Sequence, residues 1–167
     1  MGISFSDMRK KLEQENICSS LRGRVQYFAT RYRKVHYQEG RIGICFDHKE
    51  VFQSSFLEWA IARGKYSEQI SSLSEKQYRE NMDLWDEEVG WHIGFDHFRF
   101  YSAFYEYDNQ SIEKSLVSDD DLVRLFAILD KRVGKRRLKI IEERISKEPV
   151  WIQCLFFLRK DAEKEYQ

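Results

Sequence analysis

The stretch from Ser118 to Arg159 decides the fold, and it reads SDDDLVRLFAILDKRVGKRRLKIIEERISKEPVWIQCLFFLR. Ser118 is typical of a helix N-cap, and Asp121 three positions later can complete a capping box. Apolar residues then recur at the i, i+3, i+4, i+7 spacing of one helix face. They are Leu122, Leu125, Phe126, Leu129 and Val133. This pattern predicts a helix with one buried face.

Two further helices follow in the same stretch. Gly134 interrupts the apolar stripe, which restarts at Leu138, Ile141 and Ile145. Pro149 is the only proline and suits the first turn of a helix, where its missing N–H would be unpaired anyway. The segment 150–158 is apolar nearly all round, and a helix without a polar face is expected at the centre of a fold.

The N-terminal part of the chain predicts a small sheet. Residues 4–16 indicate a short amphipathic helix, and residues 24–37 and 41–47 alternate with the period of two typical of strands. The turn at 38–40 would join these strands into an antiparallel hairpin, and residues 49–53 can add a third strand. A lone hairpin is only marginally stable, so it must pack on helices or pair with another strand.

Helical patterns dominate the rest of the chain, including a predicted helix at 97–108 that follows Asp96. A chain of 167 residues favours one domain. We therefore predict a single α+β domain over 1–167, with a helix and the hairpin sheet at 1–53 and helices at 54–167.

The composition narrows the function classes. Basic and acidic residues balance at 28 each, which argues against a dedicated nucleic-acid binder. Cys18, Cys45 and Cys154 form no CxxC pair, so reduced thiols in a cytosolic protein are expected. The start, MGISFSDMRKKLEQE, lacks the long apolar run of a signal peptide, and no apolar stretch is long enough for a membrane span. We predict a cytoplasmic protein.

Motifs that dictate a reaction are missing from the sequence: it contains no Gly-rich phosphate loop, G-x-S-x-G elbow, dinucleotide fingerprint or HExxH. We therefore expect no catalytic residues, no cofactor and no bound metal. Asp47, His48 and Glu50 remain as an alternative hydrolytic or metal site. A capped turn after the second strand explains the same three residues.

Basic and aromatic residues alternate in and around the first predicted strand. Cations combined with aromatic stacking surfaces are typical of proteins that hold single-stranded nucleic acid. The residues concerned are Arg24, Tyr27, Arg31, Tyr32 and Arg33. The alternative is that the arginines cover the exposed face of the sheet and protect its edge.

A second basic cluster surrounds Gly134 and consists of Lys131, Arg132, Lys135, Arg136, Arg137 and Lys139. Cations near a helix C-terminus are favoured by the helix dipole. The cluster is either a solvated helix junction with ion pairs to nearby aspartates, or a contact for a phosphate-bearing or acidic partner.

An acidic belt lies in the middle of the chain and consists of Glu75, Glu80, Asp83, Asp86, Glu87 and Glu88. It is either the solvated side of a helix or the contact surface for a basic partner. If that partner were a basic nuclease, these carboxylates would be the expected contact.

Three blocks carry a family resemblance: LRGRVQYFATRYR at 21–33, FYEYDNQSIEKSLVSDDDLVRLFAILDKRVGKRRL at 104–138, and PVWIQCLFFLR at 149–159. Together they resemble an uncharacterised family of small bacterial proteins common in Bacillus-like organisms. The resemblance spans both ends of the chain but not 54–94, and it implies no catalytic residues. It implies relatives encoded beside polymorphic toxins, and hence an immunity role.

We therefore expect a non-enzymatic cytosolic module that binds another protein, most concretely an immunity protein that covers the active surface of a toxin. Abundant Tyr, Trp and Arg, the residues enriched at interface hot spots, favour this reading. The alternative is an RNA-associated protein that uses the basic and aromatic hairpin.

Overall fold

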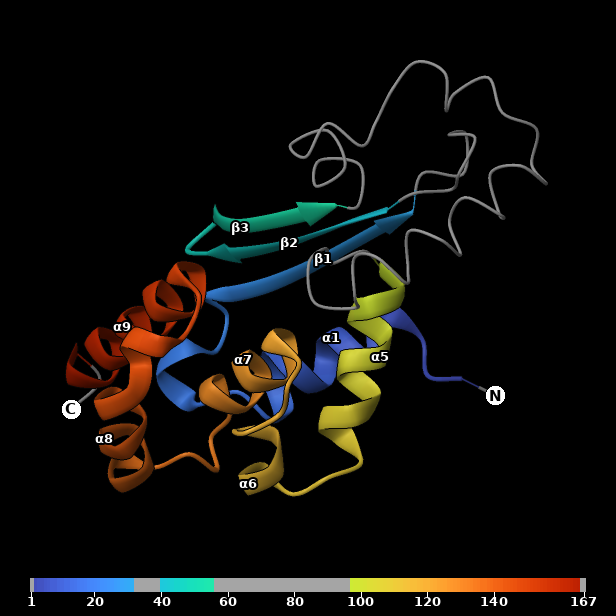
Figure 1. The fold of residues 1–167 in the computed structure, drawn as a ribbon. Helices are drawn as coiled ribbons and strands as arrows, with labels where there is room; N and C mark the ends of the chain where they lie inside the picture. The colour runs from blue at the N-terminus through green and yellow to red at the C-terminus, as the bar shows by residue number, and fades with distance from the viewer. Residues whose placement is uncertain (1, 32–39, 56–96, 166–167) are drawn as a thin grey trace, which may run out of the picture.

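The computed structural model describes residues 2–31, 40–55 and 97–165 (Figure 1). A three-stranded antiparallel sheet lies above a layer of helices, and the C-terminal part of the chain is helical (Figure 1). The predicted α+β class is confirmed. The turn was predicted at 38–40: Gly40 instead begins the second strand, and 38–39 lie outside the described residues, as do the helices predicted between 56 and 96.

The sheet has the order β1-β2-β3, formed by Val25–Arg31, Gly40–Phe46 and Lys49–Ser55. All three predicted strands are confirmed within the described residues, but β3 extends two residues beyond the predicted 49–53, so the boundary of the helical part predicted at 54 is wrong. Tyr27 pairs with Ile44, and Ile44 with Phe52, so these three side chains share one face. A register shift between Ile44 and Cys45 marks a bulge in the second pairing.

Asp47 and His48 form the two-residue turn between β2 and β3. Both have positive φ, at 48° and 64°. A two-residue hairpin turn with positive φ at both central positions matches the right-handed twist of the strands, and aspartate tolerates it better than most residues. The turn is what brings Lys49–Ser55 back alongside β2.

Aromatic rings join the sheet to the helices. The N-terminal helix α1 (Phe5–Lys10) continues as a π-helical turn at Lys11–Glu15, and α5 (His97–Asp108) also packs on the sheet. The ring of Tyr27 meets Phe126 edge-on at 5.4 Å, and Phe126 meets Phe100 in the same way at 5.5 Å. Such edge-to-face pairs are the favoured geometry for packed rings.

Helix α7 (Asp121–Leu129) is the central helix of the described structure. All five residues of the predicted stripe are buried, and so are Val123, Ala127 and Ile128. The predicted N-cap is wrong by two positions: Asp120 accepts the N–H of Leu122 at 2.8 Å. Ser118 instead accepts the N–H of Asp120 at 3.1 Å, and thereby orients the cap.

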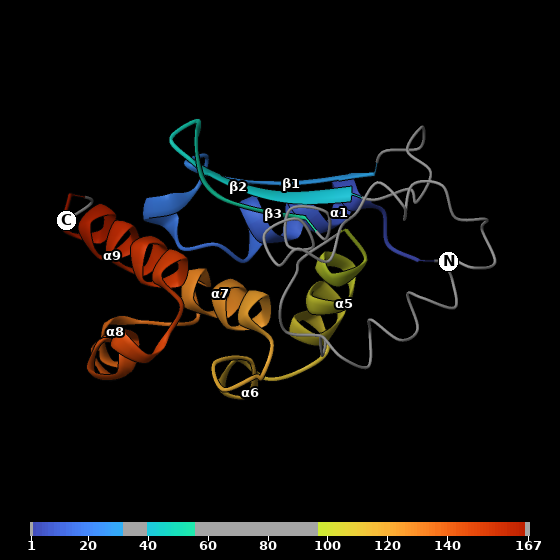
Figure 2. The ribbon, with the colours of Figure 1, turned by 45° about the horizontal axis from the view of Figure 1, so that its top comes forward.

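Three helices complete the chain around α7: α6 (Ile112–Ser115), α8 (Lys135–Arg144) and α9 (Val150–Glu165). Short 3-10 turns lie at Ser19–Leu21 (η2) and Ile145–Lys147 (η3). Helices α8 and α9 lie side by side at the end of the molecule away from α5 (Figures 1 and 2). The predicted stripe of α8, Leu138, Ile141 and Ile145, is buried.

The prediction that the last helix is central is wrong. Only one side of α9 is buried, by Ile152, Leu155, Phe156, Arg159 and Ala162. Val150, Cys154 and Phe157 are exposed on the opposite side. The central place belongs to α7, because it is sandwiched between α5, α6 and α9.

Candidate binding site on the C-terminal helices

Asp130 closes the C-terminal end of α7 and is fully buried. Its carboxylate accepts hydrogen bonds from the Tyr107 hydroxyl and from Arg132, whose Nη2 lies 2.6 Å away. The main-chain N–H of Arg132 also donates to it at 2.7 Å. A buried carboxylate needs this many donors to offset its lost hydration. Asp130–Arg132 is therefore a turn held together by hydrogen bonds to the Asp130 carboxylate.

Arg159 locks α9 onto the same turn. Its side chain is only 1% exposed, and it donates to the main-chain oxygens of Ile128, Asp130 and Val133. Its charge is paired with Glu163, at 2.9 Å. Carbonyl groups at a helix C-terminus lack intrahelical donors, and a cation placed there is favoured by the helix dipole. One side chain thus satisfies the end of α7 and holds α9 in place.

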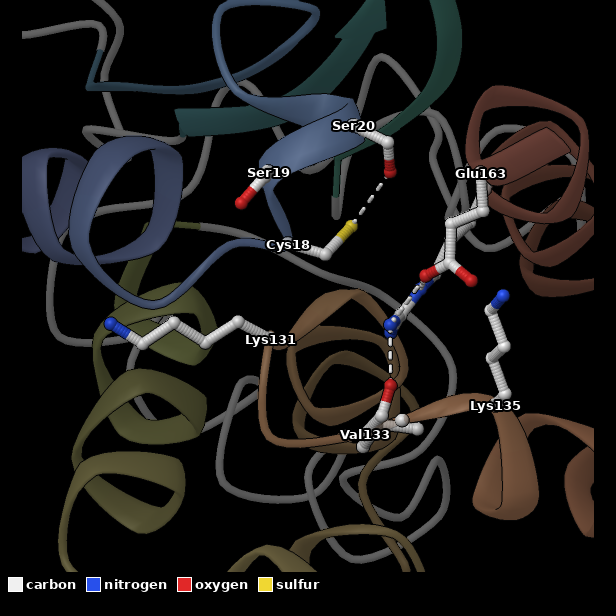
Figure 3. A pocket seen from close by; sticks show the side chains of 9 residues that line it. Cys18, Ser19, Ser20, Lys131, Val133, Lys135 and Glu163 are labelled. Carbon is white, nitrogen blue, oxygen red and sulfur yellow. Dashed lines mark hydrogen bonds and ion pairs between the residues drawn. The ribbon is translucent and has the colours of Figure 1, made fainter. Parts of the chain in front are cut away.

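The N-terminal segment is tied to this turn from the other side. The N–H of Cys18 donates to the Leu129 oxygen at 3.0 Å, and the N–H of Lys131 donates to the Asn16 oxygen at 2.7 Å. A cavity of about 340 Å³ lies between residues 18–20, the turn 131–135, and the last turns of α9 (Figure 3). All three walls are thus held by hydrogen bonds.

The second basic cluster is split between two helix ends. Lys131 and Arg132 follow the C-terminus of α7, as expected, but Lys135, Arg136 and Arg137 form the first turn of α8. We expected the helix dipole to favour the whole cluster. This expectation is wrong for Lys135, Arg136 and Arg137, because the dipole disfavours cations at a helix N-terminus. No acidic residue stands in this first turn, and Gly134 at the N-cap has no side chain with which to accept its N–H groups.

Several of these cations are neutralised by neighbours. Arg132 pairs with Asp130, and Arg137 pairs with Glu113. The ammonium of Lys131 donates to the main-chain oxygen of Glu15 at 2.5 Å, which leaves its charge uncompensated. Among the described residues, Lys135 has neither an ion pair nor a side-chain hydrogen bond. Lys131 and Lys135 therefore carry charges without a carboxylate partner among the described residues, and the ammonium of Lys131 points away from the cavity (Figure 3).

Helix α9 presents an apolar outer stripe. Val150 is 79% exposed and Phe157 is 44% exposed, and Cys154 lies exposed between them. The spacing i, i+4, i+7 places the three side chains on one side of the helix, opposite Leu155 and Arg159. We call these three residues the α9 stripe.

A profile of the SF0329 protein family matches residues 4–160. The chain belongs to the SF0329 family. No curated protein and no solved structure matches the chain significantly. The span shared with the SF0329 family includes the Asp130 turn, Arg159, the α9 stripe and the walls of the cavity up to position 160.

The basic and aromatic residues of the hairpin, which we expected to hold nucleic acid, do not all lie on one exposed surface. Tyr27 is buried in the core of this SF0329 chain, and burial raises the pKa of its hydroxyl well above the usual range. It therefore offers no ring to a base, which corrects the role expected of it. The strand period places it inward, a signal that was present in the sequence. Arg31 ends β1, while Tyr32 and Arg33 lie outside the described residues.

Arg24 supports the turn of the hairpin. It pairs with Asp47 at 2.7 Å, and its guanidinium lies 4.7 Å from the centre of the Phe46 ring. The hydrogen bond from Arg24 lowers the pKa of Asp47. This contact ties the start of β1 to the β2–β3 turn and supports the alternative reading, in which the arginines belong to the sheet surface.

The alternative hydrolytic site also has its carboxylates in ion pairs. Glu50 pairs with Arg41 at 2.7 Å, as Asp47 does with Arg24. Within residues 2–31, 40–55 and 97–165, no group of three His, Cys, Asp or Glu side chains could hold a metal ion. The acidic belt from Glu75 to Glu88 lies outside the described residues. No helix in the described part of the chain is long and apolar enough to cross a bilayer.

Sequence reasoning missed two features of this SF0329 fold. The first is Arg159, whose burial could have been inferred because it continues the buried side of α9 at i+4 from Leu155. The second is the α9 stripe. A helix that is apolar on more than one face is ambiguous in sequence. The additional apolar residues can indicate either a central helix or an exposed docking face.

Proposed function

We propose that the protein is a non-enzymatic cytosolic module that binds another protein through the α9 stripe. The observation that carries this proposal is the exposure of Val150 and Phe157 on the side of α9 that points away from the core. Large apolar side chains aligned on one exposed helix face are characteristic of protein interaction surfaces. The fitting partner surface is an apolar groove that accepts anchors at i, i+4 and i+7.

The rim of the stripe favours a protein partner over a lipid surface or RNA. Lys147, Asp161 and Lys164 are exposed near its ends, and Asp161 and Lys164 pair with each other at 3.0 Å. An apolar centre with a rim of both charge signs is the usual anatomy of a protein interface. A helix that lies on a membrane would carry mainly Lys and Arg beside its apolar face. RNA binding would need cations next to stacking rings.

Within this class we propose immunity to a polymorphic toxin, the role implied by the family resemblance of the sequence. An immunity protein can act by covering the active surface of its toxin, so it needs no reaction of its own. The acidic belt, Glu75, Glu80, Asp83, Asp86, Glu87 and Glu88, is our proposed contact for a basic toxin domain. Charge reversal there should then slow association with the toxin.

The test is an affinity capture from the protein's own host, with and without nuclease treatment. Mass spectrometry identifies the captured proteins. Three baits are compared: the natural chain, Phe157→Glu, and Ile140→Glu. Ile140 is 55% exposed on α8 and serves as a matched apolar position outside the α9 stripe. Both variants must keep the urea midpoint of the natural chain before capture is compared.

We expect one stoichiometric, nuclease-resistant protein with the natural chain and with Ile140→Glu, and a loss of at least about tenfold with Phe157→Glu, the effect of one interface hot spot. Co-expression should then neutralise the toxicity of the captured protein if it is a toxin. Equal capture by all three baits would overturn the α9 placement. Ribosomal or RNA-linked material that disappears with nuclease would replace the proposal with the RNA-associated alternative.

A further inference from the structure

The α9 stripe is nearly symmetric about its middle residue. Val150 lies four positions before Cys154, and Phe157 lies three positions after it. A second α9 laid antiparallel across the stripe, with Cys154 facing Cys154, therefore sets each Val150 against the Phe157 of the other copy. Helix α9 lies at the end of the molecule away from α5, where a second copy can approach it (Figure 2). The stripe is thus complementary to itself.

The charged residues beyond the two ends of the stripe favour the same antiparallel arrangement. Lys147 precedes Val150 by three positions, is exposed, and has no ion pair within the described part of the chain. Asp161 follows Phe157 by four positions, and its pair with Lys164 is exposed, so water screens it and Asp161 can change partner. Antiparallel helices bring Lys147 of one copy to Asp161 of the other at both ends, whereas parallel helices would bring like charges together.

We propose that a second copy of the chain covers the α9 stripe when no other partner is bound, in a two-fold symmetric dimer with antiparallel α9 helices. This inference rests on the proposed function, since it concerns the regulation of the same surface. Aligned apolar side chains that are exposed on a free protein favour association. In a two-fold dimer one patch makes every contact twice, and such dimers are the commonest homo-oligomers.

The small size of the stripe makes this dimer weak enough for a partner to displace it. Three side chains of a 16-residue helix form the apolar centre on each copy. A stable interface buries about 800 Å² on each partner, which is more than one such stripe supplies. Another protein that binds the stripe must separate the two copies, because both contacts use the same side chains. Self-association therefore keeps the stripe covered and competes with partner binding.

Sedimentation velocity of the purified full chain, over about 5 to 500 µM and under reducing conditions that prevent a disulfide between two Cys154 residues, measures self-association without any partner. We expect a concentration-dependent dimer. Phe157→Glu should weaken it at least about tenfold, and the control Ile140→Glu on α8 should leave it unchanged. A natural chain that stays monomeric throughout this range, or an equal loss with both variants, would reject the dimer.

A charge swap tests the antiparallel arrangement. Lys147→Glu alone and Asp161→Lys alone should each weaken self-association about threefold to tenfold, because each change places like charges together at both ends. The double variant should recover most of the affinity of the natural chain, since it restores opposite charges with their positions exchanged. A double variant that associates more weakly than both single variants would contradict the arrangement.

The dimer and the proposed function fail separately in these measurements. A monomeric chain whose Phe157→Glu variant loses its captured partner removes only the dimer. A dimer that Phe157→Glu disrupts, together with equal capture by all three baits, removes only the proposed partner contact. Addition of the captured protein to the dimer should yield a one-to-one complex, and a complex that retains two copies of the chain would contradict the competition between them.

Discussion

The guanidinium of Arg159 donates a hydrogen bond to the main-chain oxygen of Asp130 at 3.1 Å, in a site closed to solvent. The same guanidinium serves the oxygens of Ile128 and Val133. The carboxylate of Asp130 in turn holds Tyr107 and Arg132. A single connected polar network therefore joins α5, the end of α7, the turn before α8, and α9. The proposed contact surface on α9 depends on this network, because the network fixes the position of α9.

Arg159→Met should destabilise the protein by about 3 to 5 kcal/mol, because buried carbonyl groups and the Glu163 carboxylate lose their donor. The free energy of unfolding is measured by urea denaturation. Arg159→Lys should recover only part of this loss, since an ammonium lacks the planar fork that reaches several oxygens at once.

Arg136→Met is the control for that experiment, because Arg136 is exposed in the first turn of α8. It should change the free energy of unfolding by less than about 0.5 kcal/mol. A loss of less than about 1 kcal/mol for Arg159→Met would show that the network contributes little to stability.

Leu155→Ala should cost about 2 to 5 kcal/mol, because Leu155 is 1% exposed on the inner side of α9. Val150→Ala, in the same helix but on the α9 stripe, should cost less than about 0.5 kcal/mol. Urea denaturation of both variants measures the difference. Similar losses in the two variants would mean that the stripe is also packed against something in solution.

Much of the fold could be predicted because its signals are local. The alternation in Val25–Arg31 and Gly40–Phe46 sets the inner face of the sheet, and the stripe from Leu122 to Val133 sets the buried face of α7. Each depends on residues close in sequence, so the period alone reports it. Which of α7 and α9 is the central helix could not be predicted in this way, since that depends on which other helices cover each of them.

The candidate site was harder to predict than the fold. Arg159 and Asp130 are 29 positions apart, and nothing in either local sequence reports that one will bind the other. The cation cluster around Gly134 was visible, but the dipole that acts on it could not be assigned. Its sign depends on whether Gly134 ends one helix or starts the next, and Gly134 starts α8.

Ser115→Ala should stabilise the protein by about 1 kcal/mol, because the Ser115 hydroxyl oxygen is buried with no hydrogen-bond partner. The matched control is Ser102→Ala, an exposed serine of α5 that shares the gain in helix propensity. The urea midpoint of Ser115→Ala should rise further than that of the control. A fall in the midpoint would show that the hydroxyl is bonded in solution.

Alkaline pH should destabilise the folded protein through two buried tyrosines. Burial raises the pKa of Tyr27, and burial together with the hydrogen bond to Asp130 raises the pKa of Tyr107. A tyrosine in the unfolded chain ionises near about pH 10. Below that pH both states keep the proton, so the stabilising contribution is complete. Above it only the unfolded chain loses the proton, and stability falls as pH rises.

Each of the two hydroxyls should add a slope of about 1.4 kcal/mol per pH unit above pH 10 to the free energy of unfolding. Urea denaturation at several pH values measures this slope, and absorbance near 295 nm follows tyrosine ionisation. Tyr107→Phe lowers stability at neutral pH because Asp130 loses a donor. It should also reduce the slope above pH 10 by the contribution of one hydroxyl. The slope is the decisive readout, since a purely structural loss would lower the whole curve without changing it. Ionisation of all nine tyrosines near pH 10 in the folded chain would contradict the buried placement of Tyr27 and Tyr107.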